Sequence, residues 1–467
     1  MRLTKIICTL GPATSSKSVQ KKLVQSGMDV ARLNLSHGCF ADHKANFKQI
    51  RAISRELNKK VAVLFDLPGP KLRLKFPEKP VILKENDLIE ISTGASLSKA
   101  VAVNYKGLPS DLEPGNHILI NEGQVRLKVA AINRDSIEAK VEVGGEVQRG
   151  NGFSVPGVKL NLPSLTKNDI SLARQSCAAG ADWLAQSFVK KAADIAKLRE
   201  AVAQEGCSVP IMAKIEKKEA VENLEEIIET ADGVMVARGD LGIELSPEDV
   251  PIIQKRIIGL ATLAGKPVVT ATQMLESMIN SPTPTRAEAS DVANAIFDQT
   301  DAVMLSGETA IGNYPGESVS VMRRIIDKTE ANINYGQMLE AKAHIVSEEP
   351  TDAISYASAE LAHDLKASLI ITATQTGNTA MHVSKYRPSK PILAVTPDNQ
   401  TAYKLKMAWG VYPVVIKPSK NIDDMFEKAI SAARENRLLK KGQKAVITAG
   451  VLVNIPGTTN LIKVQEA

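Results

Sequence analysis

Short, continuous apolar runs that each end in a polar residue recur along this chain, and segments of helical period separate them. Uninterrupted apolar runs are typical of strands buried on both faces, and their alternation with helices indicates strand–helix–strand units. Eight runs follow this pattern, at residues 5–10, 30–35, 61–65, 183–185, 211–213, 233–237, 267–271 and 302–305. Together they predict a (β/α)₈ (TIM) barrel, an α/β fold.

The spacing of the eight runs is uneven, because the third and fourth are separated by far more than one helix. Residues 70–163 fill this gap with short alternating stretches and turn signals such as Glu113-Pro114-Gly115. We therefore expect a small β-barrel domain that is inserted after the third strand and acts as a lid. Prolines at its borders, in Pro68-Gly69-Pro70 and at Pro163, would make stiff hinges.

A second series of strand-like runs begins after residue 341. These runs lie at 369–372, 392–395, 414–416 and 445–448, and helical segments again alternate with them. The pattern predicts a C-terminal α/β domain. The expected domains are thus the barrel at 1–69 and 164–341, the inserted lid at 70–163 and the C-terminal domain at 342–467.

Composition places the chain among globular proteins with small anionic substrates. At 467 residues it is too long for one ordinary core, and 44% apolar and 24% charged residues match a soluble protein. The formal net charge of +6 is small for this length and is not gathered into a basic arm. These features argue against a nucleic-acid partner.

The cysteines and the apolar runs bear on the compartment. Cys8, Cys39, Cys177 and Cys207 show no paired spacing, so we expect neither a disulfide framework nor a zinc site, and a reducing compartment. No apolar stretch approaches the roughly 20 residues that a membrane span needs. The first residues, Met1 to Lys5, run directly into a strand pattern. We therefore expect a cytoplasmic protein with no membrane partner.

Polar residues stand at most of the predicted strand ends, where a (β/α)₈ barrel gathers its chemistry. They are Arg32, Asn34, Ser36, His37, Asp66, Arg73, Ser187, Lys214, Glu216, Arg238, Asp240, Thr272, Gln273, Ser306 and Glu308. One such residue is usually only a solvated cap. Seven strand ends of this kind are better explained by a shared functional site than by seven separate solvated caps.

The fifth and sixth strand ends predict a metal and phosphate site. Glu216 and Asp240 offer two carboxylates to Mg²⁺ or Mn²⁺, which leaves other coordination positions for phosphate, carboxylate and water oxygens. Lys214 ends a buried strand, where a purely structural lysine is unusual. The turn after the sixth strand opens a helical stretch, so its free N–H groups can bind an anion that Gly239 allows to approach closely.

Six ordered blocks contain most of these residues: ARLNLSHG (31–38), IMAKIE (211–216), MVARGDLG (235–242), ATQMLESM (271–278), PTRAE (284–288) and MLSGETA (304–310). In these blocks the chain resembles the pyruvate kinases, and the resemblance covers nearly its whole length. It implies the fold expected above, with the C-terminal domain as an effector domain. It also implies transfer of the phosphoryl group of phosphoenolpyruvate to ADP, which gives ATP and pyruvate in the final step of glycolysis.

The resemblance implies catalytic roles for several strand ends. Lys214 and Arg32 would bind the phosphoryl group, and Thr272 would lie near the face where the enolate carbon is protonated. A hydroxyl is a poor acid, so we expect Thr272 to orient a water chain. Ser306 and Glu308 would complete that relay; helix capping by Ser306 is the alternative. The implied substrate site consists of Lys214, Gly239, Asp240, Thr272 and Arg32.

Nucleotide and monovalent-cation sites are implied in the same way. The nucleotide phosphates are expected at Asn34, His37 and Arg73, with an ordinary ion pair as the alternative for Arg73. Potassium-dependent relatives carry a threonine, a lysine and a glutamate where this chain has Leu67, Pro68 and Lys71. The resemblance thus implies that potassium is not required, because the Lys71 ammonium takes over the charge of that ion. The predicted internal-cation region is Asn34, Ser36, Asp66, Leu67 and Lys71.

An effector site is expected in the C-terminal domain, where a strand is followed by the start of a helix. The residues are Thr374, Thr376, Gly377, Asn378 and Thr379, which offer hydroxyl and backbone N–H groups to a phosphate. The resemblance implies a sugar-phosphate or nucleotide effector, with residues 457–460 as the facing loop. Many relatives have arginine in place of Asn378, so a plain helix start with threonine caps is the alternative.

The resemblance also implies a homotetramer, in which Arg286 and Glu288 belong to the part that crosses subunits. Two other functions remain open from the sequence. A metal-dependent barrel lyase acting on oxo-acids would use the same acids, but it would not need the lid or the third domain. A non-catalytic metabolite sensor would be expected to have lost some of Lys214, Glu216, Asp240 or Thr272, and all four are present.

Overall fold

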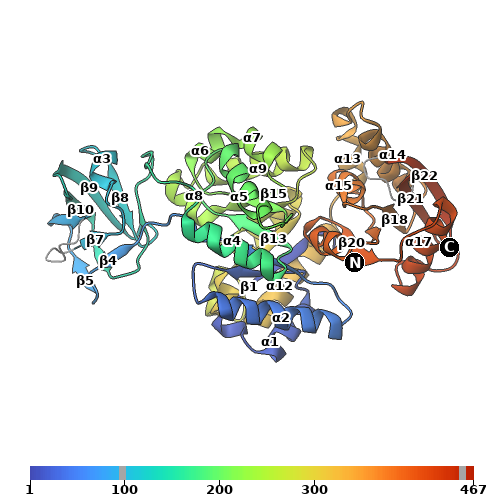
Figure 1. The fold of residues 1–467 in the computed structure, drawn as a ribbon, viewed down its shortest axis with the longest axis horizontal. Helices are drawn as coiled ribbons and strands as arrows, with labels where there is room; N and C mark the ends of the chain where they lie inside the picture. The colour runs from blue at the N-terminus through green and yellow to red at the C-terminus, as the bar shows by residue number, and fades with distance from the viewer. Residues whose placement is uncertain (94–100, 452–458) are drawn as a thin grey trace.

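A computed structural model of the chain describes residues 1–93, 101–451 and 459–467. It shows three bodies in a row, with a β-rich domain at one end, a barrel in the middle and the C-terminal domain at the other end (Figure 1). The predicted fold class is confirmed. The border residues assigned to the three domains stay a prediction.

Eight parallel strands close the central barrel in the order β1-β17-β16-β15-β14-β13-β3-β2. They are β1 (Lys5–Leu10), β2 (Val30–Asn34), β3 (Ala62–Asp66), β13 (Trp183–Gln186), β14 (Ile211–Ile215), β15 (Gly233–Ala237), β16 (Val268–Ala271) and β17 (Ala302–Leu305). Every predicted run is thus a strand. Each strand is buried on both faces, as in β14, where Met212 joins the core inside the barrel and Ile211 packs outward.

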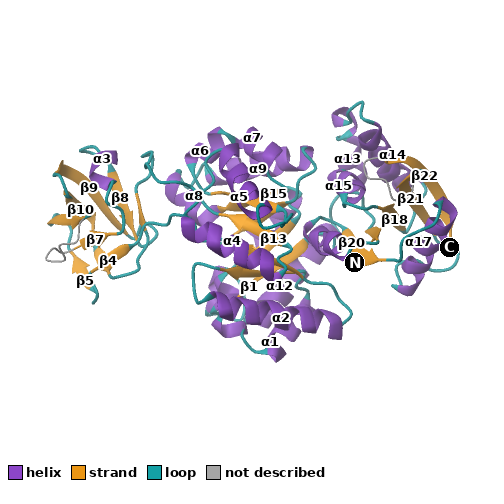
Figure 2. Cartoon of the chain, in the orientation of Figure 1, coloured by secondary structure: helices purple, strands orange, loops and turns teal. Residues whose placement is uncertain are grey.

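Helices surround this barrel, as Figure 2 shows. The longer ones are α1 (Lys17–Ser26), α2 (Phe40–Glu56), α4 (Lys167–Ala179), α5 (Ala192–Ala203), α7 (Leu224–Thr230), α9 (Val250–Leu263), α10 (Arg286–Phe297) and α12 (Pro315–Glu330). Short helices α6 (Lys218–Glu222), α8 (Arg238–Glu244) and α11 (Gly307–Ala310) follow β14, β15 and β17. A capping box begins α10, where Thr285 and Glu288 each accept a hydrogen bond from the other's backbone N–H group.

The inserted domain lies between β3 and β13, as the sequence predicts. Its strands are β4 (Leu74–Phe76), β5 (Val81–Leu83), β6 (Leu88–Ser92), β7 (Val101–Val103), β8 (His117–Ile120), β9 (Val125–Ile132), β10 (Ser136–Val143), β11 (Gly145–Val147) and β12 (Phe153–Ser154), with one short helix, α3 (Leu108–Asp111). Seven strands pair in the order β12-β8-β9-β10-β6-β7-β4, and β11 pairs with β5. They enclose an apolar core of their own.

The C-terminal domain contains a five-stranded sheet in the order β20-β19-β18-β21-β22. The elements are α13 (Tyr335–Glu340), α14 (Pro350–Asp364), β18 (Leu369–Ala373), α15 (Asn378–Lys385), β19 (Ile392–Thr396), α16 (Asn399–Lys404), β20 (Val411–Val415), α17 (Ile422–Glu435), β21 (Lys444–Gly450) and β22 (Thr459–Glu466). Sequence analysis did not predict β22. This antiparallel edge strand is mostly half-buried or exposed, so it lacks a continuous apolar run.

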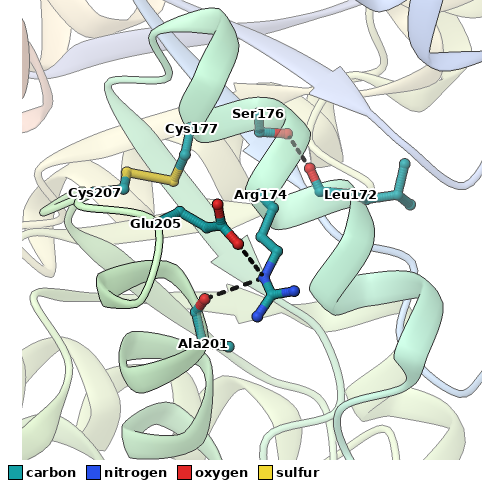
Figure 3. The surroundings of a disulfide bond; sticks show 7 residues. All are labelled: Leu172, Arg174, Ser176, Cys177, Ala201, Glu205 and Cys207. Carbon is teal, nitrogen blue, oxygen red and sulfur yellow. Dashed lines mark hydrogen bonds and ion pairs between the residues drawn. A yellow bond between two sulfur atoms is a disulfide. The ribbon is translucent and has the colours of Figure 1, made fainter.

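The expectation that the cysteines form no disulfide is wrong. Cys177, in α4, is bonded to Cys207, which follows α5, and their Cα atoms are 6.1 Å apart (Figure 3). Packing of the two neighbouring helices brings the pair together, which the linear spacing does not reveal. Cys8 and Cys39 are free. The argument for a reducing compartment from unpaired cysteines therefore no longer applies.

Within the described residues, no helix has both the length and the apolar character required to cross a bilayer.

Candidate active site

A buried charge cluster occupies the carboxyl ends of β3, β13 and β14, which are neighbours in the barrel. Nζ of Lys214 lies 2.8 Å from Oε1 of Glu216 and 3.3 Å from Oδ1 of Asp66. It also donates a hydrogen bond to Oγ of Ser187 at 2.7 Å. Burial lowers the pKa of Lys214, but the two carboxylates outweigh burial and raise it above its usual value. Lys214 is therefore an ammonium group.

Asp66 joins a second cation to this cluster. Nε and Nη2 of Arg32, on β2, lie 2.7 and 2.6 Å from Oδ2 of Asp66. Nη1 of Arg32 donates to Oγ1 of Thr9 at 2.9 Å. Burial raises the pKa of Asp66, but Lys214 and Arg32 outweigh that effect and lower it. One carboxylate thus holds two cations side by side, an arrangement suited to binding a phosphoryl group.

Glu216 and Asp240 provide hard oxygen ligands of the kind a divalent cation prefers. Oε2 of Glu216 accepts a hydrogen bond from the N–H of Phe188 at 2.8 Å, whereas its buried Oε1 accepts no hydrogen bond of regular geometry. Burial, and to a lesser extent the charge of Asp240, raises the pKa of Glu216. The repulsion between the two acids fits a bound cation, which Oε1 of Glu216 could meet in place of its ion pair with Lys214.

The fit to a metal is incomplete in ligand number. Among the described residues, no group of three His, Cys, Asp or Glu side chains is arranged to hold a metal ion. Two carboxylates would therefore leave several positions to water and substrate oxygens, which is usual for Mg²⁺ at phosphate-transfer sites.

Lys71 contacts Asp240, a residue outside the predicted internal-cation region. Its Nζ donates to Oδ1 of Asp240 at 3.0 Å. Leu67 is buried at the end of β3. Oδ1 of Asn34 accepts a hydrogen bond from the N–H of Ser36 at 3.1 Å, which closes a local turn. The replacement of potassium by Lys71 stays a prediction.

Thr272 follows β16 and faces the start of α8. Its Oγ1 accepts a hydrogen bond from the N–H of Gly239 at 2.8 Å and donates to the carbonyl oxygen of Ala271 at 2.7 Å. At the end of the next strand, β17, Oε2 of Glu308 accepts a hydrogen bond from the N–H of Ser306 at 2.7 Å. Oγ of Ser306 is buried, makes no capping bond and has no hydrogen-bond partner among the residues that the structure describes. The alternative that the Ser306 side chain caps a helix is therefore wrong.

A cleft of about 320 Å³ separates the inserted domain from the barrel. Its lining includes His37, Lys71, Arg73, Asn151, Phe188, Glu216, Lys217, Asp240 and Glu244. Arg73 donates to the carbonyl oxygen of Gly150 at 2.8 Å, and it forms no ion pair with any described residue. Burial and the charges of Arg73 and Lys71 lower the pKa of His37. Two of the three predicted nucleotide residues therefore line this cleft; Asn34 does not.

Two further residues of the site were named from the sequence without a role. Ser187 bridges Lys214 to the carbonyl oxygen of Leu67, to which it donates at 2.7 Å. Arg238 lies under the loop that carries Thr272. Their positions at strand ends were the available signal, but their partners include backbone carbonyls, which sequence patterns do not mark.

The expected effector residues form a turn and the start of α15. Oγ1 of Thr374 accepts from the N–H of Gly377 at 2.9 Å, and Gly377 has a φ of +95°. Thr379 is hydrogen-bonded to Thr459 at 2.7 Å. In the expected facing loop, residues 457 and 458 lie outside the described residues. Effector binding stays a prediction.

The comparisons with known proteins agree along the whole chain. Family models described as the barrel domain and the alpha/beta domain of pyruvate kinase match residues 1–319 and 352–465. Pyruvate kinases from Staphylococcus epidermidis and Staphylococcus aureus are 42% and 41% identical to the chain, over 100% of it and 80% of each relative. The crystal structure of a pyruvate kinase from Cryptosporidium parvum is 38% identical, with a TM-score of 0.93, and covers 100% of this chain and 96% of its own.

Proposed function

The chain belongs to the pyruvate kinase family, and we propose that the residues at the carboxyl ends of its barrel strands transfer the phosphoryl group of phosphoenolpyruvate to ADP. The products are ATP and pyruvate, and the reaction is the final step of glycolysis. The observation that carries the proposal is the buried ammonium of Lys214, held 3.3 Å from Asp66 and 2.8 Å from Glu216.

Lys214 and Arg32 are assigned to the phosphoryl group. Phosphoryl transfer through a loose transition state demands positioning and neutralisation of charge more than covalent work. Both cations are already oriented by Asp66, so they need little rearrangement when the substrate arrives. Lys214 would also stabilise the negative charge that develops on the enolate oxygen.

Glu216 and Asp240 are assigned to a divalent cation, Mg²⁺ or Mn²⁺. When bound, such a cation would neutralise charge on the phosphate and carboxylate oxygens of the substrate. The N–H groups that follow Gly239 at the start of α8 would hold the substrate carboxylate, and Gly239, which has no side chain, would let it approach closely.

Thr272 is assigned to the second half of the reaction, in which the enolate carbon accepts a proton. Its hydroxyl is fixed between Gly239 and Ala271, so it can hold one water in a constant direction. The unpaired hydroxyl of Ser306 is available to the same water chain.

ADP is assigned to the cleft between the inserted domain and the barrel, with His37 and Arg73 near its phosphates. Closure of the inserted domain would exclude water and suppress hydrolysis of the phosphoryl donor. Activity without potassium is proposed on two grounds: Leu67 has no side-chain oxygen to offer a monovalent cation, and the ammonium of Lys71 would supply the charge of that ion.

The remaining assignments come from the resemblance to the family. They are a homotetramer that uses the region of Arg286 and Glu288, a cytoplasmic location, and a sugar-phosphate or nucleotide effector at Thr374, Thr376, Gly377, Asn378 and Thr379. The turn that Thr374 closes ahead of α15 supports the last of these.

A coupled assay tests the proposed function directly. The purified chain, supplied with Mg²⁺, phosphoenolpyruvate and ADP, should form ATP and pyruvate in equal amounts. Cleavage of an oxo-acid without ATP formation would favour the lyase alternative. Binding of both substrates without turnover would favour the sensor.

A further inference from the structure

The loop that carries Thr272 has an unusual backbone. Thr272 and Gln273 follow β16 with φ angles of +65° and +53°. Neither residue is a glycine, and the left-handed conformation is unfavourable for a residue with a Cβ, above all for one branched there. Such a backbone persists only where the surrounding structure holds it.

The side chain of Arg238 supplies that support. Its Nε donates to the carbonyl oxygens of Ala271 and Thr272 at 3.3 and 3.2 Å. Its Nη2 donates to those of Thr272 and Gln273 at 2.7 and 3.1 Å. Arg238 is only 9% exposed. The planar guanidinium therefore satisfies three consecutive carbonyl groups, which the point charge of a lysine cannot do.

Arg238 is itself fixed from the opposite side. Its Nη1 lies 2.7 Å from Oδ1 of Asp291, which belongs to α10. The third nitrogen, Nη2, also lies 2.8 Å from Sδ of Met274. All three nitrogens thus contact protein atoms, and the side chain has a supporting role beneath the loop.

The same short stretch of chain also holds the hydroxyl of Thr272. Gly239, which follows Arg238, donates its N–H to that hydroxyl, and the hydroxyl donates to one of the carbonyl groups that Arg238 holds. Release of the carbonyls would let the loop leave the left-handed region and turn the hydroxyl away. The direction of the Thr272 hydroxyl therefore depends on the guanidinium.

We propose that Arg238, anchored by Asp291, is a positioning residue for protonation of the enolate carbon. The inference rests on the role of Thr272 in the proposed function. Lys214 and Arg32 take their orientation from Asp66 and not from this loop. Loss of Arg238 should therefore impair proton transfer at carbon more than phosphoryl transfer.

Exchange of the methyl hydrogens of pyruvate with D₂O isolates the proton-transfer half. It is measured by proton NMR with the full chain, Mg²⁺ and inorganic phosphate. Arg238→Met and Thr272→Ala should each slow exchange by about a hundredfold, and the double variant should be no slower than the slower single one. Asp291→Asn, which keeps the guanidinium but loosens it, should slow exchange by roughly tenfold.

A solution of guanidinium ions should restore part of the exchange in Arg238→Ala and none in Thr272→Ala, whereas Arg238→Lys should remain slow. Arg256→Met is the matched control, because Arg256 pairs with Glu225 on the outer surface at 2.8 Å. Its exchange should equal that of the unaltered chain. Calorimetric Mn²⁺ binding verifies that each variant keeps its fold.

Three results would overturn the inference. The first is normal exchange in Arg238→Met and Asp291→Asn while Thr272→Ala is impaired. The second is additive loss in the double variant without rescue by guanidinium, which indicates a general structural effect. The third is normal exchange in Thr272→Ala, because Thr272 would then have no role in protonation of the enolate carbon. Phosphoryl transfer would still be tested separately by ATP formation.

Discussion

The ammonium of Lys71 donates a hydrogen bond to Oδ1 of Asp240 at 3.0 Å, although 169 residues separate the two in sequence. The contact ties the start of the inserted domain to a carboxylate proposed to hold a divalent cation. Burial raises the pKa of Asp240, but Lys71 and Lys214 outweigh it and keep the pKa low. Asp240 is thus ionised before any cation arrives, and Lys71 competes with that cation.

Removal of this competitor should strengthen cation binding. Lys71→Met should lower the dissociation constant for Mn²⁺ about fivefold, since one partly exposed charge at this distance is worth about 1 kcal/mol. Calorimetry without substrate measures the constant. Lys75→Met, on an exposed position of the same domain, should leave it unchanged. Unchanged or weaker binding in Lys71→Met would contradict the competition.

Potassium should not be needed for turnover. In a buffer free of sodium and potassium, ATP formation by the unaltered chain should be insensitive to added potassium. The double variant Leu67→Thr and Lys71→Glu regains an oxygen ligand and loses the ammonium, so its turnover should rise with potassium concentration. A strong potassium response of the unaltered chain would refute the role of Leu67 and Lys71.

Lys214→Met should lower kcat by about a thousandfold, which is the usual effect of losing one preorganised group at a developing charge. Mn²⁺ and phosphoenolpyruvate should still bind, as measured by calorimetry. Ser187→Ala removes only one hydrogen bond to the ammonium, so its effect should be much smaller. Near-normal turnover of Lys214→Met would dispose of the assignment.

Lys342 should make stability depend on pH. Burial, followed by the charge of Arg387, lowers the pKa of Lys342 from 10.5 to about 6. Between pH 6 and 10.5 the unfolded chain therefore binds a proton that the folded chain does not, so this group's contribution to stability rises with pH across that window.

Removal of the amine isolates this contribution. Thermal unfolding should be compared for Lys342→Met and the unaltered chain. The melting temperature of the variant minus that of the unaltered chain should be largest near pH 6 and should fall steadily toward pH 10. A difference that does not vary with pH would show that Lys342 is not buried as a neutral amine.

The disulfide should stabilise the barrel without affecting catalysis. It closes a loop of 30 residues, which the chain-entropy relation equates with about 3–4 kcal/mol. Cys177 and Cys207 lie near the carboxyl ends of helices, at the end of the barrel opposite the charge cluster, because the helices run antiparallel to the strands. Cys177→Ser with Cys207→Ser should lower the melting temperature and leave kcat unchanged.

Thiol titration checks the pairing itself. The denatured, unreduced chain should show two free thiols, those of Cys8 and Cys39, whereas a count of four would show that the bond does not form.

The barrel could be predicted from the sequence because each strand is buried on both faces and appears as an unbroken apolar run. The edge strand β22 could not, because its exposed residues break that pattern. Spacing along the chain likewise hid the bond between Cys177 and Cys207, since only the packing of α4 against α5 creates it.

Strand ends identified the charged residues of the site, but not all their partners. Lys71 and Asp240 meet only through the orientation of the inserted domain. Thr272 and Gln273 are not residues that ordinarily indicate a left-handed backbone, so nothing in the sequence marks the carbonyl groups that Arg238 holds.

Because Arg32 and Lys214 share the single carboxylate of Asp66, the orientation of each cation depends on the same side chain. A substitution that shifts Asp66 would disorient both at once, and a change to either cation would alter the electrostatic environment of the other. Independent adjustment of the two is thereby restricted, and adaptation of this enzyme to a new phosphoryl donor would have to begin elsewhere in the cleft.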